Sequence, residues 1–165
     1  MSFHTAFGSL GSYAKGHIEI INDNPKYYVF SNVFEVANQS KPWEKVAVAK
    51  NLEYVIEAIR AEGTSPWMAC SHDEFAVVLD GDVSVEYVKL ENAEAIAPAS
   101  KEGTVLVKGE PKGKRMGTIR LKRGHQALLP KGAAYRFIAS RASAMIQQTI
   151  KGELTLERWG QICYR

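Results

Sequence analysis

Short β-rich segments that end at turn residues dominate the chain from Ser65 onward. They read EFAVVL, VSVEYVKL, TVLV, GTIRLK, HQALLP, AYRFIA, SAMIQQTI and ELTLERW, and the residues that break the series are Gly124, Pro130 and Gly132. Many short strands separated by turns are typical of a β-sandwich or barrel, because each strand needs a second layer to cover its apolar face. The pattern therefore predicts an all-β fold.

Two of these segments and one upstream segment carry local signals. EFAVVL is a continuous apolar strand, and Asp80-Gly81 directly after it predicts a hairpin. In VSVEYVKL, Val83, Val85 and Tyr87 occupy alternate positions, so we expect them on one face of a strand. Upstream, LEYVIEAIRAEG fits either a helix or a strand by its apolar spacing.

The first 50 residues differ from the rest, because they show little periodicity and hold a group of aromatic residues. Ser40 could cap a short helix that has Pro42 in its first turn. Aromatic residues are enriched in interface cores, so this segment suits an arm that packs on a partner, although it could equally pack across its own barrel. We therefore expect an N-terminal arm, residues 1–50, and a barrel, residues 51–165. The aromatic residues that could contact a partner are Tyr27, Tyr28, Phe30, Phe34 and Trp43.

Length and cysteine content set broader bounds. A chain of 165 residues fits one domain, and a domain of this size buries about 70% of its unfolded surface. Cys70 and Cys163 are too few for a disulfide scaffold, so we expect reduced thiols and a cytoplasmic location. The N-terminus lacks a signal-peptide pattern, and no apolar run approaches the roughly 20 residues that cross a bilayer, so we expect no membrane contact.

The charge pattern gives no sign of an anionic partner. Net charge is +3, and the one basic concentration is the stretch KGEPKGKRMGTIRLKRG, which contains no aromatic residue. Nucleic-acid binding needs basic charge together with aromatic platforms for the bases. We therefore expect a solvated hairpin here and no nucleic-acid partner.

The spacing of turn residues matches two cupin motifs in the correct order. Glu74, six intervening residues and Gly81 match the end of the first motif, G-x5-H-x-H, three or four residues, E-x6-G. Gly124, five residues, Pro130-Lys131-Gly132, two residues and Tyr135 match the second, G-x5-P-x-G-x2-H. The chain thus resembles a cupin over roughly residues 55–150, which implies a double-stranded β-helix, or jelly-roll barrel, with an N-terminal arm and a short helix. It also favours a strand for VIEAIRAEG.

The resemblance implies that the usual metal ligands have been replaced. Cupins hold a divalent metal with two histidines and a glutamate from the first motif and one histidine from the second. Those positions fall here on Met68, Cys70, Glu74 and Tyr135. A lone carboxylate cannot hold iron or zinc, because such sites need three or more converging ligands. We therefore expect no metal and no catalytic residue in this chain.

A substitute ligand set is the alternative. Its candidates are Cys70, His72, Glu74, Tyr135 and His125. In the cupin arrangement His72 falls in a turn between strands, and His125 starts a strand away from the metal. We favour instead a plug of large side chains, with Met68 and Tyr135 filling the metal's volume. A buried Glu74 then needs a partner, and the Tyr135 hydroxyl is the expected donor.

The whole chain, including GSYAKGHIEIINDNPKYYVFSNVFEVANQSKPWEKVAVAKN, resembles the small subunit of the two-subunit hydroquinone dioxygenases. In that family an iron(II) enzyme cleaves hydroquinone with O2 to 4-hydroxymuconic semialdehyde, in para-nitrophenol breakdown. The resemblance implies that Fe(II) sits in a larger cupin-type subunit, that the assembly is an α2β2 heterotetramer, and that this chain supports the larger subunit without chemistry of its own.

Two further functions remain open from the residues alone. The chain could be a stand-alone metal-free isomerase or lyase that uses Glu74 and Tyr135 as acid and base. It could also be a cupin that binds a small ligand and performs no chemistry. Activity of the isolated chain would identify the first, and a ligand-induced rise in stability without a partner would identify the second.

Overall fold

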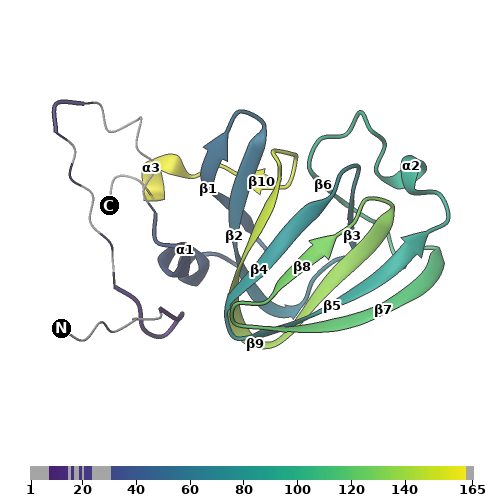
Figure 1. Ribbon diagram of the computed structural model, residues 1–165, viewed down its shortest axis with the longest axis horizontal. Coiled ribbons are helices and arrows are strands. Elements are labelled where there is room, and N and C mark those ends of the chain that lie inside the picture. Colours follow the sequence, from purple (N-terminus) through teal and green to yellow (C-terminus); the bar gives the residue numbers. More distant parts are fainter. Residues whose placement is uncertain (1–7, 15, 17–18, 20, 24–30, 163–165) are drawn as a thin grey trace.

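The computed structural model describes residues 8–14, 16, 19, 21–23 and 31–162. Helices and strands follow one another along the described residues as shown in Figure 1. In chain order they are α1 (Val33–Gln39), β1 (Lys45–Asn51), β2 (Tyr54–Thr64), β3 (Met68–Cys70), β4 (Glu74–Asp80), β5 (Asp82–Leu90), α2 (Ala93–Ile96), β6 (Thr104–Leu106), β7 (Gly113–Lys122), β8 (Gln126–Leu129), β9 (Ala133–Ile150), β10 (Thr155–Leu156) and α3 (Trp159–Ile162). The predicted all-β fold is confirmed.

The 18-residue strand β9 organises the sheet. Along one side it pairs with β2 and then β3, and along the other with β4 and then β5, always antiparallel. Beyond these strands, β1 pairs with β2, β6 with β3, β8 with β4 and β7 with β5. The long strands bend midway, so that the sheet curls into the barrel seen in Figure 1.

The predicted hairpin at Asp80-Gly81 is wrong. β4 and β5 do not pair with each other, and instead they follow one another along β9 as a single path with a bend at Gly81. Gly81 has a φ of +84°, and a Cβ there would overlap the side chain of Ser143 in β9. A dipeptide that ends in glycine suits a sharp bend as well as a hairpin, and here the glycine is needed to bend the strand around the barrel corner.

The barrel interior follows the strand alternation that the sequence predicts. Val83, Val85 and Tyr87 are buried on one face of β5, which confirms the expected pattern. Apolar residues of the two halves of β9 pack against them, among them Phe137 and Met145. LEYVIEAIRAEG forms most of β2, as the cupin resemblance favours.

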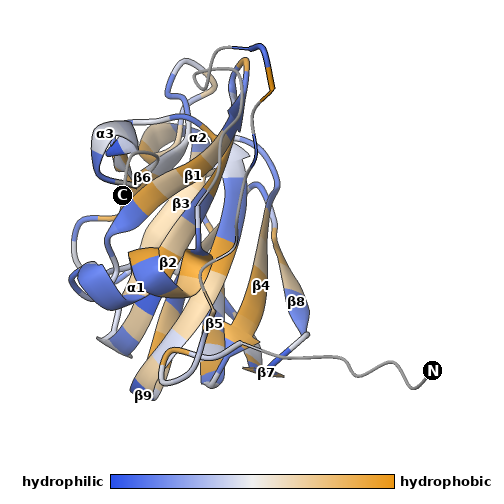
Figure 2. Cartoon of the chain, turned by 90° about the vertical axis from the view of Figure 1, so that its left-hand side faces the viewer, coloured by the Kyte–Doolittle hydropathy of each residue, from blue (hydrophilic) through white to orange (hydrophobic). Residues whose placement is uncertain are grey.

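Two outer parts of the barrel are covered by segments of the chain itself. α1 packs on the outer face of β1 and β2 through a cluster that includes Val36, Val46 and Ala58, as Figure 2 shows. The segment 91–112, which includes α2, covers β3, β5 and β9 around Trp67. The basic strand β7 is exposed along nearly its whole length, as expected, but the predicted hairpin is wrong, because β7 is a single strand that pairs with β5.

The N-terminal part differs from the expected arrangement. α1 lies before Ser40, which is the C-cap residue and not the N-cap, and the side chain of Asn32 caps the N-terminus by accepting from the backbone N–H groups of Phe34 and Glu35. Asn competes well at this position because its side-chain oxygen satisfies free N–H groups of the first turn. The barrel sheet begins at Lys45, before the predicted boundary at residue 51.

None of the helices among the described residues has the length and apolar character needed to span a membrane.

Candidate functional site

The four positions that the motif spacing assigns to cupin metal ligands meet inside the barrel. Met68 and Cys70 lie on β3, Glu74 begins β4, and Tyr135 lies on β9, where it is the cross-strand partner of Met68. Their exposed fractions are 5%, 3%, 0% and 1%, respectively. The motif spacing therefore brought together the residues it was expected to bring together.

Glu74 is held by two hydroxyl groups. The Tyr135 hydroxyl donates to its Oε2 at 2.5 Å, and the Thr104 hydroxyl donates to its Oε1 at 2.6 Å. The expected Tyr135 donor is thus confirmed, whereas Thr104 was not foreseen. Burial, followed by the neighbouring Glu74 charge, holds the pKa of the Tyr135 hydroxyl well above its usual 10.0. Tyr135 therefore keeps its proton and remains a donor.

A buried lysine extends the network on the β1 side. Lys45 Nζ lies 3.1 Å from Glu57 Oε2 and 3.3 Å from Thr104 Oγ1. The Thr155 hydroxyl donates to the other Glu57 oxygen at 2.7 Å. Lys45 and Glu57 are only 3% and 1% exposed. Only the Thr104 hydroxyl therefore separates the Lys45 ammonium from Glu74. In many proteins of this fold, the barrel interior holds a metal ion instead.

Gln147 completes the network from β9. Its amide donates to Tyr135 Oη at 3.0 Å and to Thr104 Oγ1 at 3.4 Å. Its own Oε1 is buried and has no hydrogen-bond partner among the described residues. The sequence did not predict a place in this site for Gln147, Lys45, Glu57 or Thr104. The alternation Val55, Glu57, Ile59 in β2 would have placed Glu57 on a buried face.

Part of the alternative ligand set also comes together. One donor atom each of Cys70, His72 and Glu74 lies within 4.8 Å of the others. His72 lies in the turn between β3 and β4, as predicted, with Nδ1 3.0 Å from Cys70 Sγ. His125 does not join them, because it precedes β8 and its Nδ1 accepts from the backbone N–H of Lys122.

The donor atoms of this set are already used in hydrogen bonds. Cys70 Sγ donates to the Gly103 carbonyl at 3.1 Å, and burial raises the pKa of the thiol to about 12, with the Glu74 charge adding to the rise. His72 Nε2 accepts from the Ile150 N–H at 3.2 Å, so its lone pair is already used, and Nδ1 faces Cys70. A metal needs a thiolate and free lone pairs. A metal ion could bind here only if the thiol lost its proton and these hydrogen bonds were broken.

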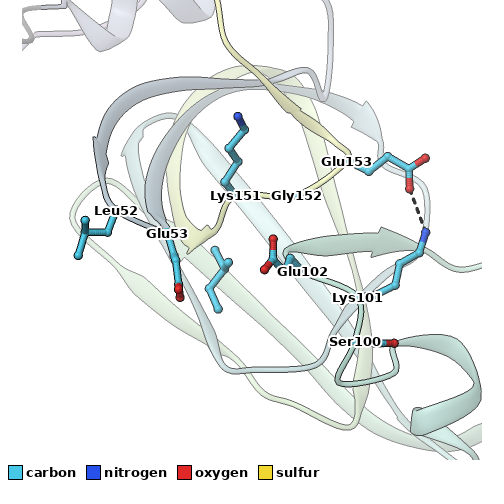
Figure 3. Close-up of a pocket in the computed structure, with 9 residues that line it drawn as sticks. Leu52, Glu53, Ser100, Lys101, Glu102, Lys151, Gly152 and Glu153 are labelled. Atoms are coloured by element: carbon cyan, nitrogen blue, oxygen red, sulfur yellow. Dashed lines mark hydrogen bonds and ion pairs between the residues drawn. The ribbon is translucent and has the colours of Figure 1, made fainter.

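Two backbone loops touch closely next to this network. A Cβ at Gly103 would lie 2.6 Å from the Gly152 Cα, and a Cβ at Gly152 would lie 2.5 Å from the Glu102 carbonyl oxygen, so these two loops touch without room for a side chain. Figure 3 shows the pocket of about 590 Å³ outside this contact, where Lys101 pairs with Glu153. None of the network residues lines it.

The predicted partner-contacting residues are described only in part. Tyr27, Tyr28 and Phe30 lie outside the described residues. Phe34 stacks on Tyr13 at 6.3 Å between ring centroids, and Trp43 stacks on Phe137 at 6.0 Å, against the barrel core. Contact of any of these residues with a partner stays a prediction.

A curled antiparallel barrel with the two motifs on β3–β4 and β8–β9 defines a cupin. A cupin-2 domain protein from Shewanella frigidimarina shares this fold, with a TM-score of 0.51 and 15% identity over 71% of this chain and 89% of that chain. The sequence matches no protein-family model and none of the curated proteins.

Two solved structures are far more similar over the full length. Hydroquinone 1,2-dioxygenase from Sphingomonas sp. TTNP3, with 4-hydroxybenzoate bound, is 53% identical over 98% of both chains, with a TM-score of 0.94. Hydroquinone 1,2-dioxygenase PnpCD, in complex with Cd2+ and 4-hydroxybenzonitrile, is 53% identical over 99% of this chain and 98% of that chain, with a TM-score of 0.92. The chain belongs to the hydroquinone 1,2-dioxygenase family, as a subunit of a ring-cleaving enzyme.

The same family contains a second, longer chain of related fold. A chain of hydroquinone 1,2-dioxygenase PnpCD in complex with Fe3+ matches with a TM-score of 0.62 and 8% identity, over 87% of this chain but only 39% of that chain. That chain is therefore more than twice as long as this one. The enzyme thus combines two kinds of cupin-fold chain, and this chain corresponds to the smaller kind.

Proposed function

We propose that this chain is the non-catalytic, metal-free small subunit of an iron(II) hydroquinone dioxygenase. The larger subunit carries the iron, and together they convert hydroquinone and O2 to 4-hydroxymuconic semialdehyde in an α2β2 heterotetramer. The small subunit contributes structural support. Its free Cys70 thiol is in keeping with the cytoplasmic location that the sequence predicts.

The single observation that carries this proposal is that side chains of this chain occupy the place where other cupins hold a metal ion. Tyr135 occupies one former ligand position and bonds to Glu74, which is the only carboxylate among the four positions. The remaining Glu74 oxygen is taken by Thr104, and Lys45 supplies a buried positive charge beside it. An iron(II) dioxygenase needs open coordination positions for substrate and O2. The side chains at the four ligand positions of this chain leave no such opening.

The same contacts argue against a metal-free acid–base enzyme. Glu74 and Tyr135 are 0% and 1% exposed, and the Gly103 and Gly152 loops touch next to their network. A general acid or base must come within hydrogen-bond reach of the substrate. The raised pKa of Tyr135 also makes its phenolate a poor base to generate near neutral pH. These residues therefore serve the fold.

Hydroquinone-dependent O2 uptake tests the proposal. Each subunit is assayed alone and then in an equimolar mixture, with iron(II) supplied to every sample. We expect turnover only in the mixture. Full activity of the larger subunit alone would remove the proposed supporting role, and turnover by the small subunit alone would show a functional centre in this chain.

A further inference from the structure

One outer face of the barrel carries no ionisable side chain. It consists of outward positions on three adjacent strands, β8, β4 and the second half of β9, in two cross-strand rows. We call this the β4–β8 face, and its residues are Phe75, Val77, Gln126, Leu128, Ile146 and Gln148. Phe75 and Leu128 are direct cross-strand partners, and each is 47% exposed.

The inward positions on the same strands show why these side chains point outward. Glu74, Ala76 and Val78 alternate with Phe75 and Val77 along β4, and all three are 0% exposed. Side chains alternate between the two faces of a strand. The β4–β8 face is thus the outer surface of a sheet whose inner surface is the filled barrel core.

Much of the rest of the described outer surface is covered or charged, although Leu52, Tyr54 and Leu106 are also exposed. α1 covers β1 and β2, and the segment 91–112 covers the outside of β3 and β5. The exposed edge strand β7 carries Lys114, Arg115, Arg120 and Lys122. Among the described residues β8 pairs only with β4 and is therefore also an edge, yet it carries no charge at all. Exposed edges are normally protected by charged residues, so β8 is an edge that lacks this protection.

We propose that the β4–β8 face is the docking surface for the larger cupin-fold subunit, which covers it with an uncharged, apolar surface of its own. This inference rests on the proposed function, because it names where that partner binds. Interface cores are depleted in charge and enriched in aromatic residues, and Phe75 at the centre of an uncharged sheet face has this character.

The neighbouring surface allows the interface to reach the usual size. A groove of about 300 Å³ adjoins the face, because its lining residue Gln148 is the cross-strand partner of both Phe75 and Ile56. Lys50 at the far side of the groove is its one charged lining residue. Leu52 and Tyr54, at the β1–β2 turn, are 86% and 54% exposed. A stable interface takes about 20–30 residues from each side. The partner is therefore expected to extend from β8 across β9 to this turn.

Two substitutions with a matched control test the surface. Phe75→Asp and Leu128→Lys each place a charge in the β4–β8 face. Met116→Lys, the control for Leu128→Lys, places a positive charge at a comparably exposed residue, 55% exposed, on β7. Binding of each purified variant to the purified larger subunit is measured by titration, and its oligomeric state is measured alone by light scattering. Thermal unfolding checks that each variant is folded.

We expect both face variants to bind at least about 30-fold more weakly, as for a central interface residue, and Met116→Lys to bind as the wild type does. Failure of the wild type to bind would contradict the proposed function itself. Wild-type binding that both face variants retain would overturn this inference alone. A wild-type dimer that the face variants dissociate, with binding to the larger subunit unchanged, would also overturn it, because a second copy would then be the occupant.

Discussion

Replacement of Lys45 by Met tests whether the buried ammonium holds the interior together. The substitution keeps the length of the aliphatic side chain and removes the charge. Lys45 Nζ lies 3.1 Å from Glu57 Oε2, and both side chains are almost completely buried. Without the ammonium, one oxygen of Glu57 loses its partner, and the other retains only the Thr155 hydroxyl. The Thr104 hydroxyl also loses a donor.

The expected loss follows from the cost of leaving one member of a buried ion pair alone. Such a change costs about 3–5 kcal/mol, which is a large part of the roughly 5–15 kcal/mol that stabilises a domain. The double variant Lys45→Met with Glu57→Gln removes both charges and should lose less than the two single variants together. The shortfall should amount to about 2 kcal/mol or more, because the residues touch.

Urea denaturation at pH 7, followed by circular dichroism, measures the free energy of unfolding of all four proteins. The charge-preserving variant Lys45→Arg controls for loss of packing. A loss below about 1 kcal/mol in Lys45→Met would refute the reasoning, because that is the range of an exposed, solvated ion pair. Additive single and double variants would likewise show that Lys45 and Glu57 do not stabilise each other.

Four further outcomes follow from the interior. Tyr135→Phe should lower the free energy of unfolding by about 1–3 kcal/mol, since Glu74 loses a buried donor; an unchanged urea midpoint would mean that Glu74 finds another partner. Burial raises the pKa of Cys70 and of Tyr87 to about 12, so their contribution to stability is complete below about pH 9 and is lost as pH rises toward 12. The urea midpoint of the wild type should therefore fall between pH 7 and pH 11, and the midpoint of Cys70→Ala should fall less. Elemental analysis of the purified chain should find far less than one iron, manganese or zinc per chain, and a full equivalent that Glu74→Ala removes would contradict this. The triple variant Met68→His, Cys70→His and Tyr135→His should show no hydroquinone-dependent O2 uptake alone, because ligands without an open, oriented pocket do not suffice; turnover by it would reveal a nearly intact centre.

The sequence predicted those parts of the site that depend on spacing within one or two strands. Glu74 and Tyr135 meet because the turn residues of both motifs fix where each strand starts. The contribution of Lys45 could not be predicted in this way, because its position inside the barrel depends on how β1 joins β2. A lysine in such a segment also resembles an ordinary surface charge.

Local sequence patterns gave wrong predictions where the same residues are common in two different local structures. Asp80-Gly81 bends a continuous strand, although the same dipeptide is common in hairpins. Ser40 ends a helix that begins at Val33, although serine more often begins one. The bend at Gly81 depends on a contact with a distant residue, its close approach to Ser143. Ser40 instead ends its helix through local contacts, because its side chain donates to the Val36 carbonyl.

The position of β9 after the four strands that it pairs with also determines when the barrel can fold during synthesis. β2, β3, β4 and β5 each depend on β9 for a neighbouring strand. Until the ribosome has released residues 133–150, these strands lack their central partner, and their apolar sides stay open to solvent. Pairings between residues far apart in the chain form slowly and leave strand edges open to aggregation. The nascent chain therefore needs protection until residues 133–150 have been made, and the barrel can present a finished surface to a partner only after that point.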